Sequence, residues 1–418
     1  MKPISCGIDF GTSNSSVAIA DHGKINLVPV ENASVTIPSA LFFQRKDVHF
    51  GREAIQLFLA KEEGRFMRSL KRVLGTSVMK QGTLVNGRIM NFSNIISLFL
   101  RHLKQKTDAY AGEELTQVVM GRPVHFQDNN PAADQQAQEE LKTIAQSVGF
   151  KDVEFQFEPI AAAFAHEVNI RGEKLAIVVD LGGGTSDFTV IRLSNQSITK
   201  TDRSSDILAN TGVRVGGNDF DKDLSLSEIM PELGYKTTFG DKRIEVPLKP
   251  FHDLSEWSKV NFLYTPKMIM QTRQLLGQSH DKIRYQRLLT VLEQETGHTV
   301  LAAAERAKIA LTSQETYEMP FDFLESGFSI PAKRDHFEEA IRYEIDKIAQ
   351  SAKECLQQAR VNPSVIDLVI LTGGTTEVPA VQQEFKQLFP NAAIADENKL
   401  SSVGLGLAYD SQNKFGKR

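Results

Sequence analysis

The sequence contains little that would mark a secreted or disulfide-rich protein. Its 418 residues include only two cysteines, Cys6 and Cys355, which lie far apart and form no CxxC pair. A disulfide framework is therefore not indicated, and we expect reduced thiols. The N-terminal residues MKPIS do not begin a signal peptide, because no apolar run ending in small residues follows them.

Features of membrane and nucleic-acid-binding proteins are also missing. No stretch approaches the ~20 apolar residues that a membrane-spanning helix needs. The formal net charge is −4 at pH 7, whereas proteins that bind nucleic acid usually present a basic surface. These absences predict a soluble, cytoplasmic protein that binds neither nucleic acid nor membrane.

An internal repeat is the most informative feature that is present. Residues 4–30 read ISCGIDFGTSNSSVAIADHGKINLVPV, and residues 174–201 read KLAIVVDLGGGTSDFTVIRLSNQSITKT. In each copy a strand ends at an aspartate, Asp9 or Asp180, and a glycine turn and a second strand follow. A further turn then leads into a third strand, directly after residues 194–196 in the second copy. The repeat predicts two similar lobes that face each other, with a ligand held between their glycine turns.

The rest of the chain alternates between helical and strand patterns, which indicates an α/β fold. Helices are expected at residues 85–110, 132–148, 299–312 and 334–360, and a strand followed by a helix at 153–169. Another strand is expected at 365–372, with a helix from about Val378. Residues 222–298 predict a separate, mostly helical subdomain, because this stretch contains several prolines and mixed charge.

The two glycine turns have the composition of a phosphate-binding site. Residues 11–14 are Gly11, Thr12, Ser13 and Asn14, and residues 182–185 are Gly182, Gly183, Gly184 and Thr185. Without a Cβ, successive turn residues can present their backbone N–H groups to an anion. The alternative is that both are ordinary hairpin turns, but two such turns that each follow an aspartate favour phosphate binding.

Three aspartates beside these turns predict a magnesium site. Asp9, Asp180 and Asp187 would repel a triphosphate unless a cation stood between them, and Mg²⁺ is usually held by one or two carboxylates plus phosphate oxygens. For Asp187 a capping or turn role is the alternative.

Seven ordered motifs resemble the nucleotide-binding half of the DnaK-like, seventy-kilodalton heat-shock chaperones. They are IDFGTSNSSVAI, SLKRVLG, FEPIAAAFAH, DLGGGTSDFTVI, VGGNDFD, AAERAKIAL and LTGGTTEVPAVQ, and they span most of the chain. Among relatives, the sequence is most similar to the short, YegD-type members. The resemblance implies a duplicated, actin-like (ribonuclease-H-like) two-lobed ATPase fold in which each lobe carries an added subdomain.

The same resemblance implies approximate lobe boundaries. Lobe I would span residues 1–168, with a base at 1–37 and 119–168 and an upper subdomain at about 38–118. Lobe II would span 169–395, with a base at 169–218 and about 330–395. Its upper subdomain, at about 219–329, would carry an insertion at 222–298. Residues 396–418 would form a C-terminal helix returning to lobe I, and the peptide-binding domain of full-length chaperones is expected to be absent.

By resemblance, ATP or ADP binds between the lobes with Mg²⁺, and the family pattern admits K⁺ as well. The implied catalytic residues are Lys71, Glu158, Asp180 and Thr185. The implied metal site comprises Asp9, Asp180 and Asp187. The implied nucleotide contacts are the two glycine turns together with Gly216, Gly217, Glu305, Lys308, Thr312, Gly373, Gly374, Thr375 and Glu377. On the residues alone, Lys71 with its basic neighbours could equally be a solvated helix face, and Glu158 could be a favourable helix N-terminal carboxylate.

The chain departs from the family pattern where the adenine would lie. Glu377 and Ile309 stand where the family has arginines, and Thr312 replaces a serine. Loss of a cation–π contact could weaken nucleotide binding by about 2- to 30-fold.

Three functions are compatible with these patterns. The first is a monomeric, slow chaperone-type ATPase that acts with a co-chaperone or other folded partner. The second is an actin-like polymer-forming ATPase, although SLKRVLG and AAERAK favour the chaperone family. The third is a small-molecule kinase of the same superfamily, but no motif supplies the additional catalytic aspartate that it would need.

Overall fold

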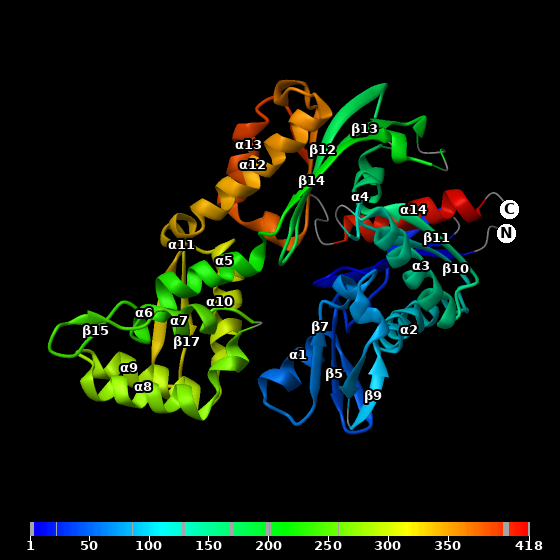
Figure 1. Cartoon of the computed structure of the whole chain (residues 1–418). Helices are drawn as coiled ribbons and strands as arrows, with labels where there is room; N and C mark the ends of the chain where they lie inside the picture. Colours follow the sequence, from blue (N-terminus) through cyan, green and yellow to red (C-terminus); the bar gives the residue numbers. More distant parts are fainter. Residues whose placement is uncertain are drawn as a thin grey trace.

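Two mixed sheets form the centre of the molecule (Figure 1). The computed structural model describes residues 4–21, 23–85, 87–127, 130–167, 170–197, 200, 202–257, 259–395 and 401–416. The expected lobe boundary at 168–169 and residues 396–400 of the expected C-terminal segment lie outside these ranges.

The strands of the two sheets come from separate parts of the chain. The first sheet has the order β11-β10-β1-β2-β3, with β4 paired to β2. Its strands are β1 (Ser5–Asp9), β2 (Asn14–Asp21), β3 (Lys24–Leu27), β4 (Thr36–Pro38), β10 (Gln117–Arg122) and β11 (Asp152–Phe157). The second has the order β20-β19-β12-β13-β14. Its strands are β12 (Glu173–Leu181), β13 (Ser186–Ser194), β14 (Ile207–Val213), β19 (Leu368–Thr372) and β20 (Ala393–Ala395).

Both sheets follow one topology, which confirms the internal repeat. The first strand of each pairs antiparallel with the next strand in sequence, β1 with β2 and β12 with β13. On its other side it pairs in parallel with a distant strand, β10 or β19. We call the part of the molecule built on each sheet the first and the second lobe.

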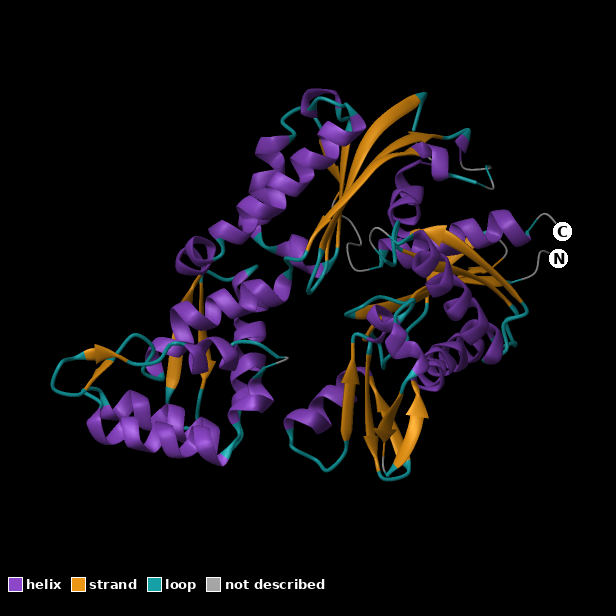
Figure 2. Ribbon diagram, in the orientation of Figure 1, coloured by secondary structure: helices purple, strands orange, loops and turns teal. Residues whose placement is uncertain are grey.

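Helices lie between the sheets and on their outer faces (Figure 2). The helices α4 (Glu158–Glu167) and α14 (Ser402–Phe415) share one hydrophobic cluster with the facing sides of both sheets. The outer face of the first sheet is covered by α2 (Phe92–Ala111) and α3 (Pro131–Ser147). The helices α12 (Arg342–Ala359) and α13 (Pro379–Leu388) cover that of the second.

Alternation along β12 shows how the sequence produces these layers. Ala176 and Val178 face the helices between the sheets, whereas Ile177, Val179 and Leu181 face the outer core. Every one of these side chains is buried, as the period of two in a central strand requires.

Each lobe also has an added part beyond its sheet, which we call its upper part and which lies below the sheets in the view of Figure 1. In the first lobe it contains β5 (Ala40–Gln44), β6 (Asp47–Phe50), β7 (Arg65–Arg68), β8 (Gly82–Val85), β9 (Arg88–Asn91) and α1 (Gly51–Leu59). In the second it contains the helices α5 (Gly217–Leu224), α6 (Met230–Glu232), α7 (Lys249–Leu254), α8 (Pro266–Gln278), α9 (Lys282–Glu293), α10 (Gly297–Leu311) and α11 (Arg334–Ala340). The same part holds the short ribbons β15 (Thr238–Phe239) with β16 (Ile244–Glu245) and β17 (Thr316–Pro320) with β18 (Ser329–Lys333).

Several expected elements differ from the structure. The helix expected at 85–110 begins only at Phe92, because residues 82–91 form the hairpin β8–β9 around Gly87, whose φ is +76°. The third strand of the second repeat is β14, which follows a 3₁₀ turn at Ser204–Asp206 and does not begin directly after residue 196. The helix expected at 334–360 is interrupted at Ile341, which separates α11 from α12.

The 222–298 region is mostly helical, as expected, but its core is not separate. Its buried side chains, including Phe251, Leu254 and Leu288, belong to the same cluster as Ile177 and Val179 of the second sheet. Both cysteines are free and buried. Within the described ranges, none of the helices combines the length and apolar character needed to cross a membrane.

Candidate functional site

The two glycine turns meet where the lobes face each other. In the first hairpin Asp9 pairs with Ser16, and in the second Asp180 pairs with Asp187. The aspartate ahead of the turn therefore has the same place in both hairpins. The Ser13 hydroxyl oxygen lies 2.7 Å from the point that a Cβ on Gly183 would occupy. The structure therefore brings the predicted phosphate turns together from opposite lobes.

Glycine is required at this junction for close backbone approach. A Cβ on Gly11 would lie 2.0 Å from the carbonyl oxygen of Asn14. A Cβ on Gly216 would lie 2.7 Å from the carbonyl carbon of Gly183 and 2.7 Å from the amide nitrogen of Gly184. These contacts are with backbone atoms, so a side chain could be accommodated only by moving the turns themselves.

The N-terminus of α5 is attached to the second turn. The backbone N–H of Gly217 donates to the carbonyl of Gly182 (3.0 Å), and that of Asn218 donates to Gly183 (2.7 Å). The hydroxyl of Thr375 also donates to Gly182 (2.9 Å), and the Lys308 ammonium donates to the carbonyl of Gly217 (3.1 Å). Four of the predicted nucleotide contacts, Gly216, Gly217, Lys308 and Thr375, thus lie around one turn.

Lys71 is buried beside Glu158. Its side chain is 8% exposed, and its Nζ lies 2.5 Å from Oε1 of Glu158, the first residue of α4. The chain reaches Lys71 through Ser69, whose φ of +58° turns β7 into a 3₁₀ helix at Leu70–Val73. This burial contradicts the alternative of a solvated basic helix face.

The ionisable groups of the site shift one another's pKa values. Burial, followed by repulsion from Glu158, raises the pKa of Asp9 to about 7. Burial, then repulsion from Asp187, Glu158 and Asp9, raises the pKa of Asp180 to about 8. Burial alone would lower the pKa of Lys71, but the neighbouring carboxylates of Glu158, Asp9 and Asp180 raise it above its ordinary value. Asp9, Asp180, Asp187 and Glu158 are therefore more acidic groups than Lys71 alone can neutralise.

This excess of carboxylates fits a divalent cation. Asp9 and Asp180 end equivalent strands of facing lobes, and their raised pKa values express the cost of two buried negative charges. Among the described residues no three His, Cys, Asp or Glu side chains converge as a closed metal cage. Mg²⁺ usually keeps several waters and takes only one or two protein carboxylates, which these aspartates can supply.

A comparison with protein families identifies this arrangement. The family model described as Hsp70 protein matches residues 5–238 and 285–414, well over half of the chain. The chain belongs to the Hsp70 family. It therefore has the actin-like two-lobed ATPase fold, and the family function is that of an ATP-binding, chaperone-type ATPase. The match omits residues 239–284, which lie inside the range expected to carry an insertion. The finer resemblance to YegD-type members stays a prediction.

The predicted base-side residues of this Hsp70 chain lie at two places. Glu305 and Lys308 are in the second half of α10, Thr312 directly follows its last residue, and Gly373, Gly374 and Glu377 follow β19. The hydroxyl of Thr312 donates to the carbonyl of Ile309 in its own helix (2.7 Å), and the Ile309 side chain is 60% exposed. Gly373 has a φ of +84° and packs close to Asp180, whose Oδ1 lies 2.9 Å from the position of a Cβ there.

The remaining predicted residues lie at the turns. Thr12, Ser13, Gly184 and Thr185 are partly exposed, and Asn14 and Asp187 are exposed. Asp187 lies next to Asp180 across the hairpin, so its carboxylate is on the same side of the sheet.

Sequence reasoning missed several residues of this Hsp70 site. Asp221 is buried and accepts a hydrogen bond from Lys308 (2.9 Å), which holds the lysine against Gly217. Asp219 accepts from the N–H of Gly216 (2.9 Å), and the Asn218 side chain lies beside Gly183. All three belong to the motif VGGNDFD, so the motif was a signal, although only its glycines were assigned.

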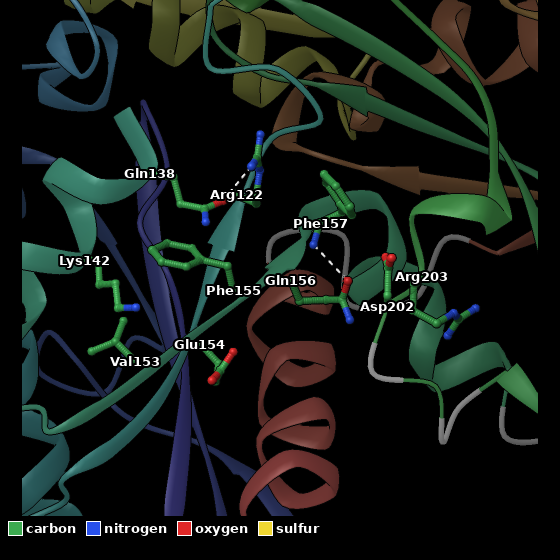
Figure 3. A pocket seen from close by; sticks show the side chains of 10 residues that line it. All are labelled: Arg122, Gln138, Lys142, Val153, Glu154, Phe155, Gln156, Phe157, Asp202 and Arg203. Carbon is green, nitrogen blue, oxygen red and sulfur yellow. Dashed lines mark hydrogen bonds between the residues drawn. The ribbon is translucent and has the colours of Figure 1, made fainter. Parts of the chain in front are cut away.

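A cavity of about 250 Å³ lies apart from these turns, between α3, β11 and Asp202 with Arg203 (Figure 3). Arg122 donates to Gln138 on one of its walls (2.5 Å). None of the predicted nucleotide residues lines this cavity, so it is not the nucleotide site. Its wall β11 nevertheless runs directly into Glu158.

Adding one methyl group at the junction of the turns should weaken nucleotide binding. We expect Gly216→Ala to raise the Kd for ADP about fivefold, because the new Cβ forces the backbone of Gly183 and Gly184 to move. Titration calorimetry would measure this. The matched control is Gly277→Ala in α8, where a Cβ meets nothing within 4 Å. Equal affinities for both variants would show that the nucleotide does not depend on this junction.

Proposed function

We propose that this chain is a magnesium-dependent ATPase whose nucleotide lies between the two glycine turns. The observation that carries the proposal is the ion pair of the buried Lys71 with the half-buried Glu158, which lies with Asp9 and Asp180 at the junction of the lobes. Burying one lysine among several carboxylates is costly for stability alone. Such an arrangement is typical of a functional site.

The residues of the site supply positioning and electrostatic stabilisation. The backbone N–H groups of both turns, with the hydroxyls of Thr12, Ser13 and Thr185, would hold the phosphates. Lys71 would orient the γ-phosphate and the attacking water, and Glu158 fixes the position of the lysine ammonium through their contact. Mg²⁺, when bound near Asp9 and Asp180, would neutralise phosphate charge. Phosphoryl transfer of this kind needs no covalent protein intermediate.

On the base side, Lys308 contributes mainly to the shape of the site. Its ammonium is shared between Asp221 and the carbonyl of Gly217, which fixes α10 against the start of α5. Since Ile309 and Glu377 occupy the positions of the family arginines, we propose that the phosphates and Mg²⁺ supply most of the binding free energy. The affinities for ATP and GTP should therefore differ less than in a family member whose arginine packs on the adenine.

Calorimetry and phosphate release together test the proposed function. We expect saturable binding of ATP and ADP with Mg²⁺, and slow phosphate release that stops when EDTA removes the metal. Binding without any phosphate release would leave a nucleotide-binding protein that is not an ATPase. Absence of binding would refute the proposal. Sedimentation with ATP should leave the protein in solution, whereas pelleting would favour the polymer-forming alternative.

A further inference from the structure

The helix α4 ends in a buried ion pair with a residue of the second lobe. It begins at Glu158, which contacts Lys71, and its last residue is Glu167. The guanidinium of Arg203 donates to both carboxylate oxygens of Glu167, at 2.9 and 2.8 Å. Both side chains are 0% exposed. Arg203 lies between β13 and β14, so the second lobe holds the end of a helix that directly follows the first sheet.

Other groups complete this buried cluster. The Nε of Arg203 donates to Asp206 (2.5 Å), which also accepts from Lys200 (3.0 Å). The backbone N–H of Ser194, at the end of β13, donates to Glu167 (2.9 Å). Burial alone would lower the pKa of Arg203, but Glu167 and Asp206 raise it above its ordinary value, so the guanidinium stays charged. We call Glu167, Arg203 and Asp206 the arginine clamp.

Stability alone does not require the arginine clamp. Taking two charges out of water is costly, and apolar side chains of similar volume often serve a fold as well as a buried ion pair does. What a guanidinium adds is direction, because its planar fork binds both oxygens of a carboxylate in one orientation. The clamp therefore fixes the place of Glu167, and with it the end of α4.

The packing of α4 leaves much of its positioning to its two ends. Four of its ten residues are alanine, and the ridges that methyl groups form interlock less deeply than those of longer side chains. Against α14 the contact is made by backbone, since a Cβ on Gly406 would lie 1.8 Å from the carbonyl oxygen of Ala161. Hydrogen bonds at the ends of α4 therefore contribute more to its position than they would in a helix with long interlocking side chains.

The helix connects the arginine clamp to the catalytic pair. Ten helical residues span roughly 14 Å, and their hydrogen-bonded backbone moves as one body. At the other end, the side chain of Glu158 is bounded by β10, because a Cβ on Gly121 would lie 3.2 Å from its Cγ. The carboxylate of Glu158 contacts the Lys71 ammonium. A shift of Glu167 would therefore move Glu158 and change the place of the lysine.

The clamp lies away from the predicted nucleotide contacts. Arg203 lines the cavity of Figure 3, on the side opposite Gln138 and Lys142 of α3. None of the predicted nucleotide residues lines that cavity. A change at Arg203 should therefore alter no direct contact with the nucleotide.

We propose that Arg203 is a positioning residue for ATP hydrolysis, which acts through Glu167 and α4 to hold the carboxylate of Glu158 where it orients Lys71. The inference rests on the proposed ATPase function. Misplacing a catalytic group by about 1 Å can cost about 100-fold in rate. Loss of the clamp should therefore slow the chemical step while nucleotide binding is retained.

The first test keeps the charge of Arg203 but removes its planar fork. We expect Arg203→Lys to lower kcat about tenfold, with unchanged KM for ATP and unchanged Kd for ADP. Steady-state phosphate release and calorimetry would measure these quantities. The matched control is Arg192→Lys in the same sheet, where the guanidinium forms an exposed pair with Glu173 (3.1 Å). It should have the kcat of the wild type.

A second variant separates positioning from stability. Combining Arg203→Met with Glu167→Gln removes both buried charges together, so neither is left unpaired. The amide oxygen of the new side chain can still accept the N–H of Ser194. This variant should melt near the temperature of the wild type and still lose kcat about tenfold. A wild-type kcat in the folded double variant would mean that the clamp serves stability only, and the proposal would be wrong.

A double-mutant cycle tests whether Arg203 acts through Glu158. In a Glu158→Gln background, Arg203→Lys should slow single-turnover hydrolysis no further, because the carboxylate that it positions is already missing. If the two losses multiply instead, Arg203 does not act through Glu158 and the proposal is refuted.

The outcomes also separate this role from the proposed function. If the wild type hydrolyses ATP, and Arg203→Lys and the double variant do so at the same kcat, the positioning role is refuted and the ATPase assignment stands. If the wild type hydrolyses no ATP, the proposed function fails, and the positioning role fails with it.

Discussion

Lys71→Ala should reduce ATP turnover by roughly 100-fold or more, while the affinity for ADP changes little. The ammonium of the buried Lys71 contacts the carboxylate of Glu158, and the carboxylates of Asp9 and Asp180 also act on its charge. Its ammonium can stabilise charge that develops on the γ-phosphate, which ADP lacks. Single-turnover phosphate release would measure the rate, and calorimetry would measure ADP binding.

Two controls make this result specific. Lys46→Ala removes an exposed lysine from the same upper part of the first lobe and should leave turnover unchanged. Lys71→Arg retains the charge but not the compact ammonium, and should recover little activity. An equal loss of turnover and ADP affinity in Lys71→Ala would instead indicate that the lysine only maintains the site's structure.

The sequence was sufficient to predict two similar lobes and the two glycine turns that face each other between them. Each repeat combines local alternation of apolar residues with a glycine turn, and both signals are contained within about 25 neighbouring residues. The repeat predicted that the two sheets would be alike, because related units form related sheets, but it did not predict the order of their strands. The aspartates Asp9 and Asp180 could be placed for the same reason.

The elements that were misplaced had weaker or competing local signals. Residues 85–91 include Arg88 and Met90, which favour a helix, yet Asn86-Gly87 is a typical hairpin sequence. The break at Ile341 has neither glycine nor proline to mark it. It depends on burial of Ile341 against the second-lobe core, which only tertiary structure reveals.

Contacts between distant residues were beyond prediction from local patterns. Asp221 is 87 residues from Lys308, and Phe58 is about 200 residues from Trp257. Phe58 and Trp257 have no distinguishing pattern in their own segments. Their rings lie 6.2 Å apart only because the two lobes meet there, and neither lobe alone contains both of them.

Asp180→Asn should have opposite effects on activity and on stability. ATP hydrolysis should fall at least about tenfold, since a carboxamide binds Mg²⁺ less well than a carboxylate. The melting temperature of the nucleotide- and metal-free protein at pH 8 should rise by about 1 °C for each kcal/mol of relieved repulsion in a chain of 418 residues. The cause is that Asp180 is buried near Asp187, Glu158 and Asp9, which raises its pKa to about 8.

The expected stabilisation by Asp180→Asn can be checked through the pH dependence of the free energy of unfolding. Because the folded state retains protons on Asp9 and Asp180 up to about pH 7 and 8, it binds more protons than the unfolded state above about pH 4. The free energy of unfolding of the metal-free wild type should therefore fall as pH rises from about 4 to 8. Asp180→Asn should weaken that slope and match the wild type near pH 4, whereas the exposed control Asp241→Asn should retain it. If Asp180→Asn melts at a lower temperature than the wild type at pH 8 and keeps the full pH dependence of the free energy of unfolding, Asp180 does not carry the raised pKa. The assignment of Asp180 to the metal site would then lose its support.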